Sequence, residues 1–231
     1  MKNFIFDLYG TLVDIRTDEG NERFKKRIDS YFSACNVGNF WARYEELCKS
    51  RDSGKYCEID LYAVFEELLG GADRETVLKA AQYFRKKSRS RLKVYRGARR
   101  LLKTLKENGA GVYLLTNAQS CFTVKELQTL RLGKLFDGIL ISSDFGKKKP
   151  SPEFFNGLIE RYNLDVGQSW YVGNDISADI EGAKGVGLSA AYIKSGLSPE
   201  SDSLERAARI ADFATGDFGE LSTFLIGQSK K

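Results

Sequence analysis

The chain has 231 residues, of which 36 are Lys or Arg, 31 are Asp or Glu and none is histidine, so its formal net charge is +5. The lack of histidine excludes catalytic triads with an imidazole base and histidine-ligated metal sites. Acid–base chemistry must therefore use Asp, Glu, Lys, Tyr or Cys. No apolar run approaches the length of a membrane span, and the first predicted strand begins after two residues. We therefore expect a cytoplasmic protein with no secretory signal.

The excess positive charge is concentrated in residues 85–103. Such a run is usually a solvated helix face and linker, and no aromatic interleaving or nucleic-acid motif accompanies it. We expect neither a nucleic acid nor a membrane as partner, and the sequence predicts no oligomeric state. The four cysteines contain no Cys-x-x-Cys pair. This favours reduced, structural thiols over a zinc site.

The first predicted element is a buried parallel strand at residues 4–6, because this run is apolar and shows no alternation. Asp7 ends the strand, and Gly10 follows in the loop, where it can adopt backbone angles that other residues disfavour. Ligands of open α/β sheets bind at the carboxyl ends of the strands. Asp7 is therefore a candidate catalytic residue, although an acid and a glycine are also ordinary turn residues.

The segment that follows, residues 15–91, has the periodicity of helices. Phe24, Ile28 and Phe32 fall on one helical face, and Gly70 precedes a new helix start at Asp73. This pattern predicts a helical insertion between the first strand and the rest of the sheet.

Beyond residue 92, strands and helices alternate. The predicted strands are 111–117, 138–143, 169–173, 189–193 and 211–214. The predicted helices include one that starts at Gly97 and stops at Asn108-Gly109, and those at 152–162 and 178–184. Repeated βα units imply right-handed crossovers and a parallel sheet that is covered on both faces. The fold class is therefore α/β, with an inserted helical domain.

Polar side chains follow several of these strands, and parallel strands bring their carboxyl ends to one edge of the sheet. The residues expected at this edge are Asp7, Tyr9, Thr11, Thr116, Asn117, Lys149, Asp175 and Asp179. An acidic nucleophile, a hydroxyl group, a lysine and a pair of acids are together the groups that phosphoryl transfer requires.

Four motifs lie in order along the chain: Asp-Leu-Tyr-Gly-Thr-Leu from Asp7, Leu-Leu-Thr-Asn from Leu114, Lys-Pro-Ser-Pro from Lys149, and Gly-Asn-Asp-x-x-x-Asp from Gly173. Their order and spacing resemble those of the haloacid dehalogenase superfamily of hydrolases. The resemblance implies a Rossmann-like catalytic core and a helical, C1-type cap. The core would comprise residues 1–14 and 92–231, and the cap residues 15–91.

The resemblance also implies roles for the residues at the sheet edge. Asp7 would be the nucleophile that forms an aspartyl intermediate, and Lys149 would offset the charge repulsion, although Lys147 and Lys148 are neighbouring alternatives. A Mg²⁺ ion would be held by Asp7, the backbone carbonyl of Tyr9, and Asp175. Three roles remain open for Asp179: a water-mediated metal ligand, a partner that orients Lys149, or a helix cap.

Substrate contacts are implied in the same way. Thr116 and the neighbouring backbone amides, including that of Ala118, would bind the transferring group. Asn117 would shape the turn or contact the substrate. Gly10 and Thr11 belong to the same loop as the nucleophile. A dehalogenase would also use a cap arginine to grip its anionic substrate, with Arg43 as the nearest candidate and Arg16 and Arg51 as alternatives.

Tyr9 departs from the family pattern, because related phosphatases usually have a second aspartate there that protonates the leaving group. General acid catalysis typically contributes about 10²–10⁴-fold in rate, and a phenol with a pKa near roughly 10 is a weak substitute. Tyrosine at this position also resembles the first motif of the 2-haloacid dehalogenases. Those enzymes, however, have a serine at the position that corresponds to Asp175. The sequence therefore favours a Mg²⁺-dependent phosphatase of a small phosphorylated metabolite over a dehalogenase. A weakly active protein that binds a phosphorylated ligand is a third alternative.

Overall fold

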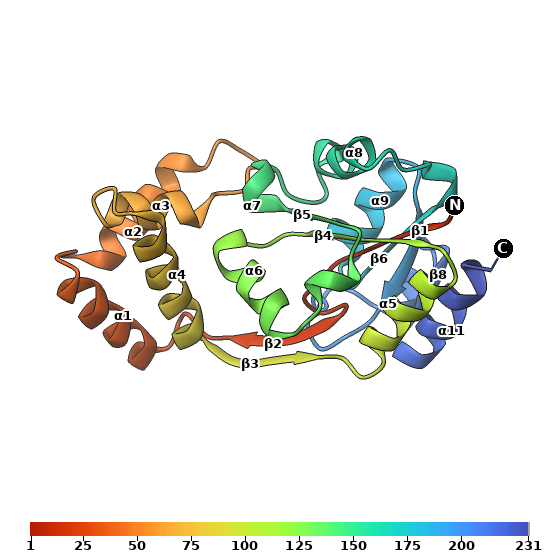
Figure 1. The fold of residues 1–231 in the computed structure, drawn as a ribbon, viewed down its shortest axis with the longest axis horizontal. Coiled ribbons are helices and arrows are strands. Elements are labelled where there is room, and N and C mark those ends of the chain that lie inside the picture. The colour runs from red at the N-terminus through yellow and green to blue at the C-terminus, as the bar shows by residue number, and fades with distance from the viewer. Residues whose placement is uncertain (231) are drawn as a thin grey trace.

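A computed structural model describes residues 1–230, and a single six-stranded sheet forms the centre of the catalytic part (Figure 1). Its strand order is β5-β4-β1-β6-β7-β8, and every neighbouring pair is parallel. The strands are β1 (Asn3–Phe6), β4 (Gly111–Thr116), β5 (Gly138–Ile141), β6 (Ser169–Gly173), β7 (Ser189–Ile193) and β8 (Phe213–Thr215). The predicted α/β class is confirmed.

Strand β1 lies in the middle of the sheet, which explains why its residues are all buried and show no alternation. Phe6, its last residue, is in register with Leu114 of β4 and Val172 of β6. The backbone N–H of Asp7 extends this pairing by donating to the Val172 carbonyl at 2.9 Å. The three central strands therefore end side by side, and the residues that follow them meet at one edge.

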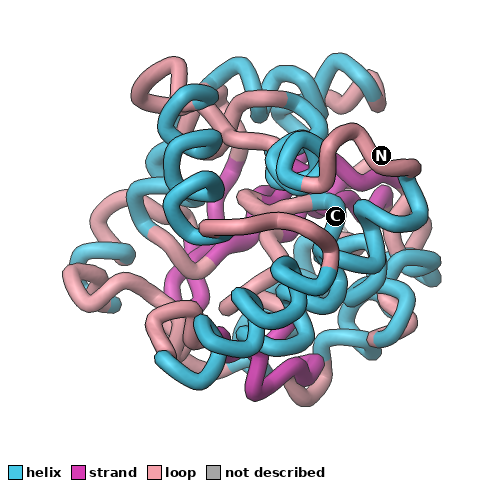
Figure 2. The backbone as a smooth tube through the Cα atoms, turned by 90° about the vertical axis from the view of Figure 1, so that its left-hand side faces the viewer, coloured by secondary structure: helices cyan, strands magenta, loops and turns pink. Residues whose placement is uncertain are grey.

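Helices cover both faces of the sheet (Figure 2). On one face, α5 (Ala98–Glu107) and α11 (Phe218–Gln228) pack against a core cluster that includes Phe4 and Phe6. The buried residues of α5 recur at helical spacing, as expected for a helix with one apolar stripe. On the other face, α8 (Pro152–Arg161) packs on a cluster that includes Ile5 and Tyr171.

The insertion contains four helices, α1 (Glu22–Ala34), α2 (Phe40–Arg51), α3 (Leu61–Leu68) and α4 (Arg74–Ser88). Their core is largely aromatic: Phe32 stacks on Phe40 with ring centroids 4.1 Å apart, and Phe24 meets Phe84 edge to face at 5.1 Å. The helical character predicted for this segment is confirmed, and the insertion fits the expected helical cap.

Two strands that the sequence did not predict join this insertion to the sheet domain. These strands, β2 (Val13–Thr17) and β3 (Arg89–Val94), form an antiparallel ribbon in which Asp14 is opposite Lys93. The predicted domain boundaries at residues 14 and 92 fall inside this ribbon.

The second half of the chain differs from prediction in small ways. The helix expected at 178–184 begins earlier, as a π-helical turn (Ile176–Glu181) followed by α9 (Gly182–Gly185). The strand expected at 138–143 ends at Ile141, where α7 (Ser142–Phe145) starts. Further short or unpredicted elements are α6 (Ser120–Thr129), α10 (Leu204–Ala207) and two 3₁₀ turns, Gly133–Leu135 and Val166–Gln168.

None of the helices within residues 1–230 combines the length and the apolar character that a membrane crossing requires.

Candidate active site

Asp7 is the central carboxylate of the site and is only 7% exposed. Lys149 Nζ donates to its Oδ1 at 2.7 Å, and Thr116 Oγ1 donates to the same oxygen at 3.2 Å. The hydroxyl of Thr11 lies 3.4 Å from Oδ2. Burial raises the pKa of Asp7 to about 6, because the opposing effect of Lys149 offsets the desolvation only in part and Asp179 adds to it. At neutral pH Asp7 is therefore an ionised, poorly solvated carboxylate.

Lys149 is the lysine that the structure brings to this carboxylate, whereas Lys147 is exposed and Lys148 is partly exposed. All three N–H groups of the buried ammonium have acceptors: Asp7 Oδ1 at 2.7 Å, Asp179 Oδ1 at 2.6 Å and the hydroxyl oxygen of Tyr171 at 2.8 Å. Burial alone would lower the pKa of Lys149, but Asp179 and Asp7 together raise it. The ammonium therefore stays charged and has a fixed direction.

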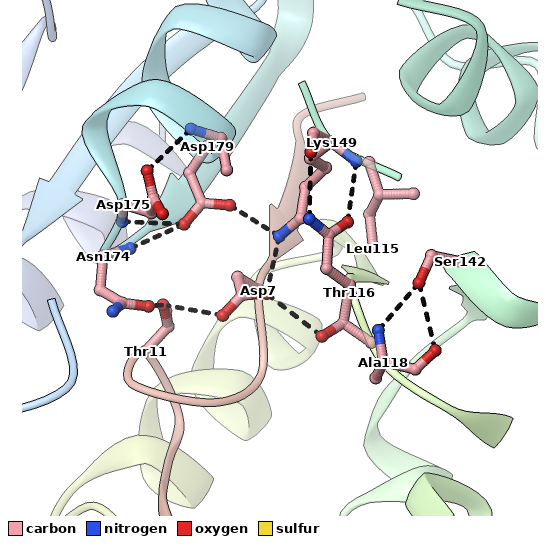
Figure 3. A network of polar contacts seen from close by, with 12 residues as sticks. Asp7, Thr11, Leu115, Thr116, Ala118, Ser142, Lys149, Asn174, Asp175 and Asp179 are labelled. Atoms are coloured by element: carbon pink, nitrogen blue, oxygen red, sulfur yellow. Dashed lines mark hydrogen bonds and ion pairs between the residues drawn. The ribbon is translucent and has the colours of Figure 1, made fainter. Parts of the chain in front are cut away.

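Asp179 orients this lysine and does not face a metal position. Its Oδ2 accepts the backbone N–H groups of Asn174 at 2.9 Å and Asp175 at 3.0 Å, while Oδ1 accepts from Lys149 (Figure 3). Gly173 makes room for this arrangement, because a Cβ there would lie 2.3 Å from Asp179 Cγ. Both carboxylate oxygens accept from protein donors, which favours the orientation of Lys149 among the three roles left open for Asp179.

The turn after β6 directs Asn174, and not Asp175, toward the nucleophile. The amide oxygen of Asn174 accepts from Thr11 Oγ1 at 3.1 Å, whereas Asp175 Oδ1 accepts the Ala178 N–H at 2.8 Å and caps the π-helical turn (Figure 3). Gly10, at a φ of 91°, is required beside this amide, because a Cβ would lie 2.4 Å from Asn174 Nδ2.

The predicted metal ligands are therefore not assembled. Within residues 1–230 no group of three or more acidic, Cys or His side chains could hold a metal ion. Asp175 is the natural N-cap of the helix that starts after it, since Asp is a preferred N-cap residue. Because Asn is an equally preferred N-cap residue, the sequence carried no signal that Asn174 would be the residue facing Asp7.

Tyr9 points away from the nucleophile. Its hydroxyl donates to Glu126 on α6 and lies 3.1 Å from Thr123 Oγ1, and the guanidinium of Arg85 lies 5.7 Å from the centre of its ring. Burial and the neighbouring Glu126 carboxylate raise the pKa of the phenol well above its ordinary value. The expectation that Tyr9 serves as a weak general acid is corrected for this reason.

Glu126 itself anchors part of the basic run. It is 2% exposed and accepts from Arg85 Nε at 2.8 Å and from Arg89 Nη1 at 2.6 Å. The prediction of a fully solvated basic face was therefore wrong for these two arginines. A glutamate on a core helix gave no sequence signal of this role, because such residues are mostly exposed.

Asn117 and Ala118 support the site through hydrogen bonds to the lysine loop and to Ser142. The Asn117 side chain accepts from the Lys149 N–H at 2.8 Å and donates to the Lys149 carbonyl at 3.1 Å. The Ala118 N–H donates to Ser142 Oγ at 2.9 Å. Asn117 thus holds the lysine loop, which favours its turn-shaping role over substrate contact, and the expected contact from the Ala118 amide is corrected.

The cap reaches the core through the segment before α3. Glu58 Oε2 accepts from Ser142 Oγ at 2.7 Å, and its Oε1 accepts from Gln119 Nε2 at 3.0 Å. Arg43, the predicted substrate-gripping residue, is exposed on α2 and, among the described residues, makes no side-chain hydrogen bond or ion pair with the site. Its neighbours Trp41 and Tyr44 pack in the aromatic core of the cap.

Tyr171 was not predicted, because a tyrosine in a buried strand is usually a core residue. Its ring is fully buried and packs edge to face on Phe155 at 5.2 Å, and its hydroxyl lies 3.0 Å from both the Leu115 carbonyl and Asp179 Oδ1. The ring cannot turn away from Lys149 without disturbing this packing.

Tyr171→Phe is therefore expected to lower kcat by about 10-fold with little change in KM, because a hydrogen bond to a charged group contributes about 1.5–3 kcal/mol. Steady-state kinetics and thermal unfolding would be compared with Tyr113→Phe. Tyr113 belongs to the same core cluster but packs against Tyr162, with the two ring planes tilted by 42°. An equal loss in both variants would show that Tyr171 has only a packing role.

The chain is similar in sequence to a family of hydrolases and to several of its characterised members. The family model of the haloacid dehalogenase-like hydrolases matches residues 1–187. The ribulose-1,5-bisphosphate 5-phosphatase of Halopiger xanaduensis is 32% identical over 131 residues, which are 55% of this chain and 55% of that protein. The chain spans about half the length of the first curated relatives that it matches.

Two solved structures share the fold at low identity. The 2-haloacid dehalogenase of Pseudomonas syringae pv. tomato superposes with a TM-score of 0.66 at 22% identity, and the match covers 97% of this chain and 98% of that chain. The putative hydrolase YfnB of Bacillus subtilis, bound to magnesium, has a TM-score of 0.54 at 20% identity, with coverage of 97% and 98%. Because the family model covers the first, second, third and fourth motifs together, the chain belongs to the haloacid dehalogenase-like hydrolases.

Proposed function

We propose that this hydrolase is a phosphatase that acts on a small phosphorylated metabolite through an aspartyl-phosphate intermediate. The observation that carries the proposal is the Lys149 ammonium, held 2.7 Å from the buried Asp7 carboxylate at the end of β1. A carboxylate that approaches a phosphate meets a repulsion of about 4 kcal/mol per charge pair at about 4 Å and intermediate dielectric. Lys149 offsets this repulsion.

The proposed reaction has two steps. An Asp7 carboxylate oxygen attacks phosphorus, the bond from phosphorus to the leaving oxygen breaks, and the leaving group departs with the electron pair. Water then attacks the phosphorus of the aspartyl phosphate, which releases inorganic phosphate and restores the carboxylate. Thr116 Oγ1, 3.2 Å from Asp7 Oδ1, is placed to orient the carboxylate for the first step.

We also propose Mg²⁺ as the cofactor, with one carboxylate fewer among its protein ligands than the sequence suggested. The fitting donors are the Asp7 carboxylate, the amide oxygen of Asn174 and the backbone carbonyl of Tyr9, all of them hard oxygens of the kind that Mg²⁺ prefers. Bound there, Mg²⁺ supplies positive charge to the phosphoryl oxygens. With one carboxylate in the set, Mg²⁺ is expected to bind mainly together with the phosphorylated substrate.

The named activities of the relatives support a small phosphorylated substrate. They include phosphatases of ribulose-1,5-bisphosphate and of glyceraldehyde 3-phosphate, although each match covers only about half of the chain or less. Two observations favour 2-haloacid dehalogenation as a second candidate: the neutral Asn174 amide beside Asp7, and a Tyr9 phenol that is turned away. Halide leaves without a proton, so that reaction needs no acid.

One pair of assays separates the two candidates. We expect purified protein to release phosphate from p-nitrophenyl phosphate when Mg²⁺ is present and to lose most of this activity in EDTA. Halide release from 2-chloropropionate is expected to stay at background. Metal-independent halide release without phosphate release would replace the phosphatase proposal with the dehalogenase, and silence in both assays would favour a binding protein.

A further inference from the structure

We propose that this site, unlike the two relatives named above whose substrates are phosphates of alcohols, selects phosphate compounds whose leaving group departs without a proton: acyl, enol and aryl phosphates. This inference rests on the proposed phosphatase function. It concerns the bond between phosphorus and the leaving oxygen, whose cleavage leaves a carboxylate, enolate or phenolate in the favoured substrates and a strongly basic alkoxide in the disfavoured ones.

The groups around Asp7 cannot supply that proton. All three N–H groups of Lys149 are donated, and two of them go to carboxylates. Asp179 accepts four hydrogen bonds, so both of its oxygens face donors and neither faces the Asp7 carboxylate. Thr11 and Thr116, the remaining side chains within hydrogen-bond distance of the Asp7 carboxylate, carry alcohols that are too weakly acidic for the task.

The position that would supply an acid is structurally committed elsewhere. Tyr9, two residues after the nucleophile, donates its hydroxyl proton to Glu126. Glu126 is in turn fixed by Arg85 at 2.8 Å and Arg89 at 2.6 Å, and the Arg85 guanidinium covers the Tyr9 ring. To turn toward a substrate, the phenol would have to leave a buried carboxylate that two cations hold in place. The missing acid is therefore a fixed property of the fold.

Three more distant carboxyl groups are also engaged. Glu58 of the cap accepts from Ser142 and Gln119, and Asp14 pairs with Arg91 at 2.6 Å. Asp175 caps the π-helical turn through the Ala178 N–H. The full chain has no histidine that could act in their place.

The chemistry then decides the substrate class. In the first step a bond forms between Asp7 and phosphorus while the leaving oxygen takes the electron pair of the broken bond. If that oxygen becomes a stabilised anion, the charges balance without a proton. If it becomes an alkoxide, the lack of a general acid costs about 10²–10⁴-fold in rate.

The test is the dependence of kcat/KM on the basicity of the leaving group. We would measure it with Mg²⁺ for p-nitrophenyl, phenyl and ethyl phosphate, and for acetyl phosphate. We expect kcat/KM to fall steadily as the leaving group becomes more basic, with ethyl phosphate about 10²–10⁴-fold below the aryl esters. A nearly flat dependence would overturn the inference and leave the phosphatase function intact. If the protein hydrolysed none of the four substrates, the proposed phosphatase function would be wrong, and the inference that rests on it would fall as well.

Two variants locate the effect at Tyr9. Tyr9→Asp places a carboxylic acid at this position and is expected to raise turnover of ethyl phosphate by about 10²-fold and to flatten the dependence on leaving-group basicity. Tyr9→Phe removes only the hydroxyl and should leave that dependence as steep as in the wild type. A flatter dependence in the wild type than in Tyr9→Phe would show that the phenol donates a proton, contrary to the proposal. Because the wild-type series needs no variant, the test stands even if Tyr9→Asp fails to fold.

Discussion

Asp7→Asn is expected to reduce phosphate release by at least about 10⁴-fold, because an amide cannot form the acyl phosphate. The nucleophile and Lys149 act together, so Lys149 alone is not expected to sustain the reaction. The substitution preserves shape, and the amide oxygen can still accept from Thr116 and Lys149 as the carboxylate does. Single-turnover and steady-state assays at saturating Mg²⁺ would measure the loss.

The same variant is expected to be at least as stable as the wild type at neutral pH. The folded-state pKa of Asp7, raised by burial to about 6, means that ionising this carboxylate destabilises the folded protein by about 3 kcal/mol relative to an ordinary aspartate. That cost is absent below the ordinary aspartate pKa of 3.8, grows as pH rises from there to about 6, and is constant at higher pH. Thermal unfolding at pH 5 and pH 8 would show it as a difference between wild type and variant.

Asp14→Asn is the matched control for Asp7→Asn. Asp14 follows the same loop, but its carboxylate pairs with Arg91 on the ribbon at 2.6 Å and is partly exposed. We expect Asp14→Asn to keep most of the activity. If Asp7→Asn retained more than a small fraction of wild-type turnover, the covalent mechanism would be excluded.

Lys149→Met is expected to lower kcat/KM by about 10²–10³-fold, the usual effect of removing one preorganised charge from an active site. It should also destabilise the fold by about 3–5 kcal/mol, because Asp7 and Asp179 would remain buried without their shared cation. The side chain of Lys149 is 2% exposed, so solvent cannot replace it.

The pH dependence of this variant has a definite sign. Lys149 lowers the pKa of Asp7, which burial already raises to about 6, so without the ammonium this pKa would rise further; the stability that depends on neutral Asp7 is present at low pH and is lost as pH rises. Unfolding temperatures of Lys149→Met should therefore fall more steeply than those of the wild type between pH 5 and pH 8. Lys147→Met, three residues before Pro150 in the same loop, is the control, because that lysine is exposed. Comparable effects in both variants would contradict the assignment of Lys149.

The sheet was predictable wherever burial leaves a strand few alternatives. β6 and β7 have the bounds expected from their apolar runs, and β1 has them within one residue. The β2–β3 ribbon was not predictable, because its residues are largely charged and partly exposed. Asp14 and Lys93 are strand partners that lie far apart in the chain, and local sequence carries no signal of such pairing.

The candidate site, too, was predictable in part. Parallel strands align their ends, and this alignment predicted that Asp7, Thr116 and Lys149 would meet. The direction of individual side chains did not follow. In the turn after β6, the choice between Asn174 and Asp175 depends on where the next helix begins, and that start lies two residues earlier than the apolar pattern suggested. The contacts of Tyr9 with Glu126 depend on how α6 packs, which no motif records.

The β2–β3 ribbon also makes the protein modular. The chain leaves the sheet domain along β2 and returns along β3, and Ile15 and Leu92 are paired neighbours in that ribbon. The helical segment between them is therefore inserted between two adjacent points, so a segment of different length or sequence can be accommodated without a change in strand order. In a lineage of such proteins, new substrates can be acquired by exchanging this segment while the nucleophile and its lysine are inherited unchanged.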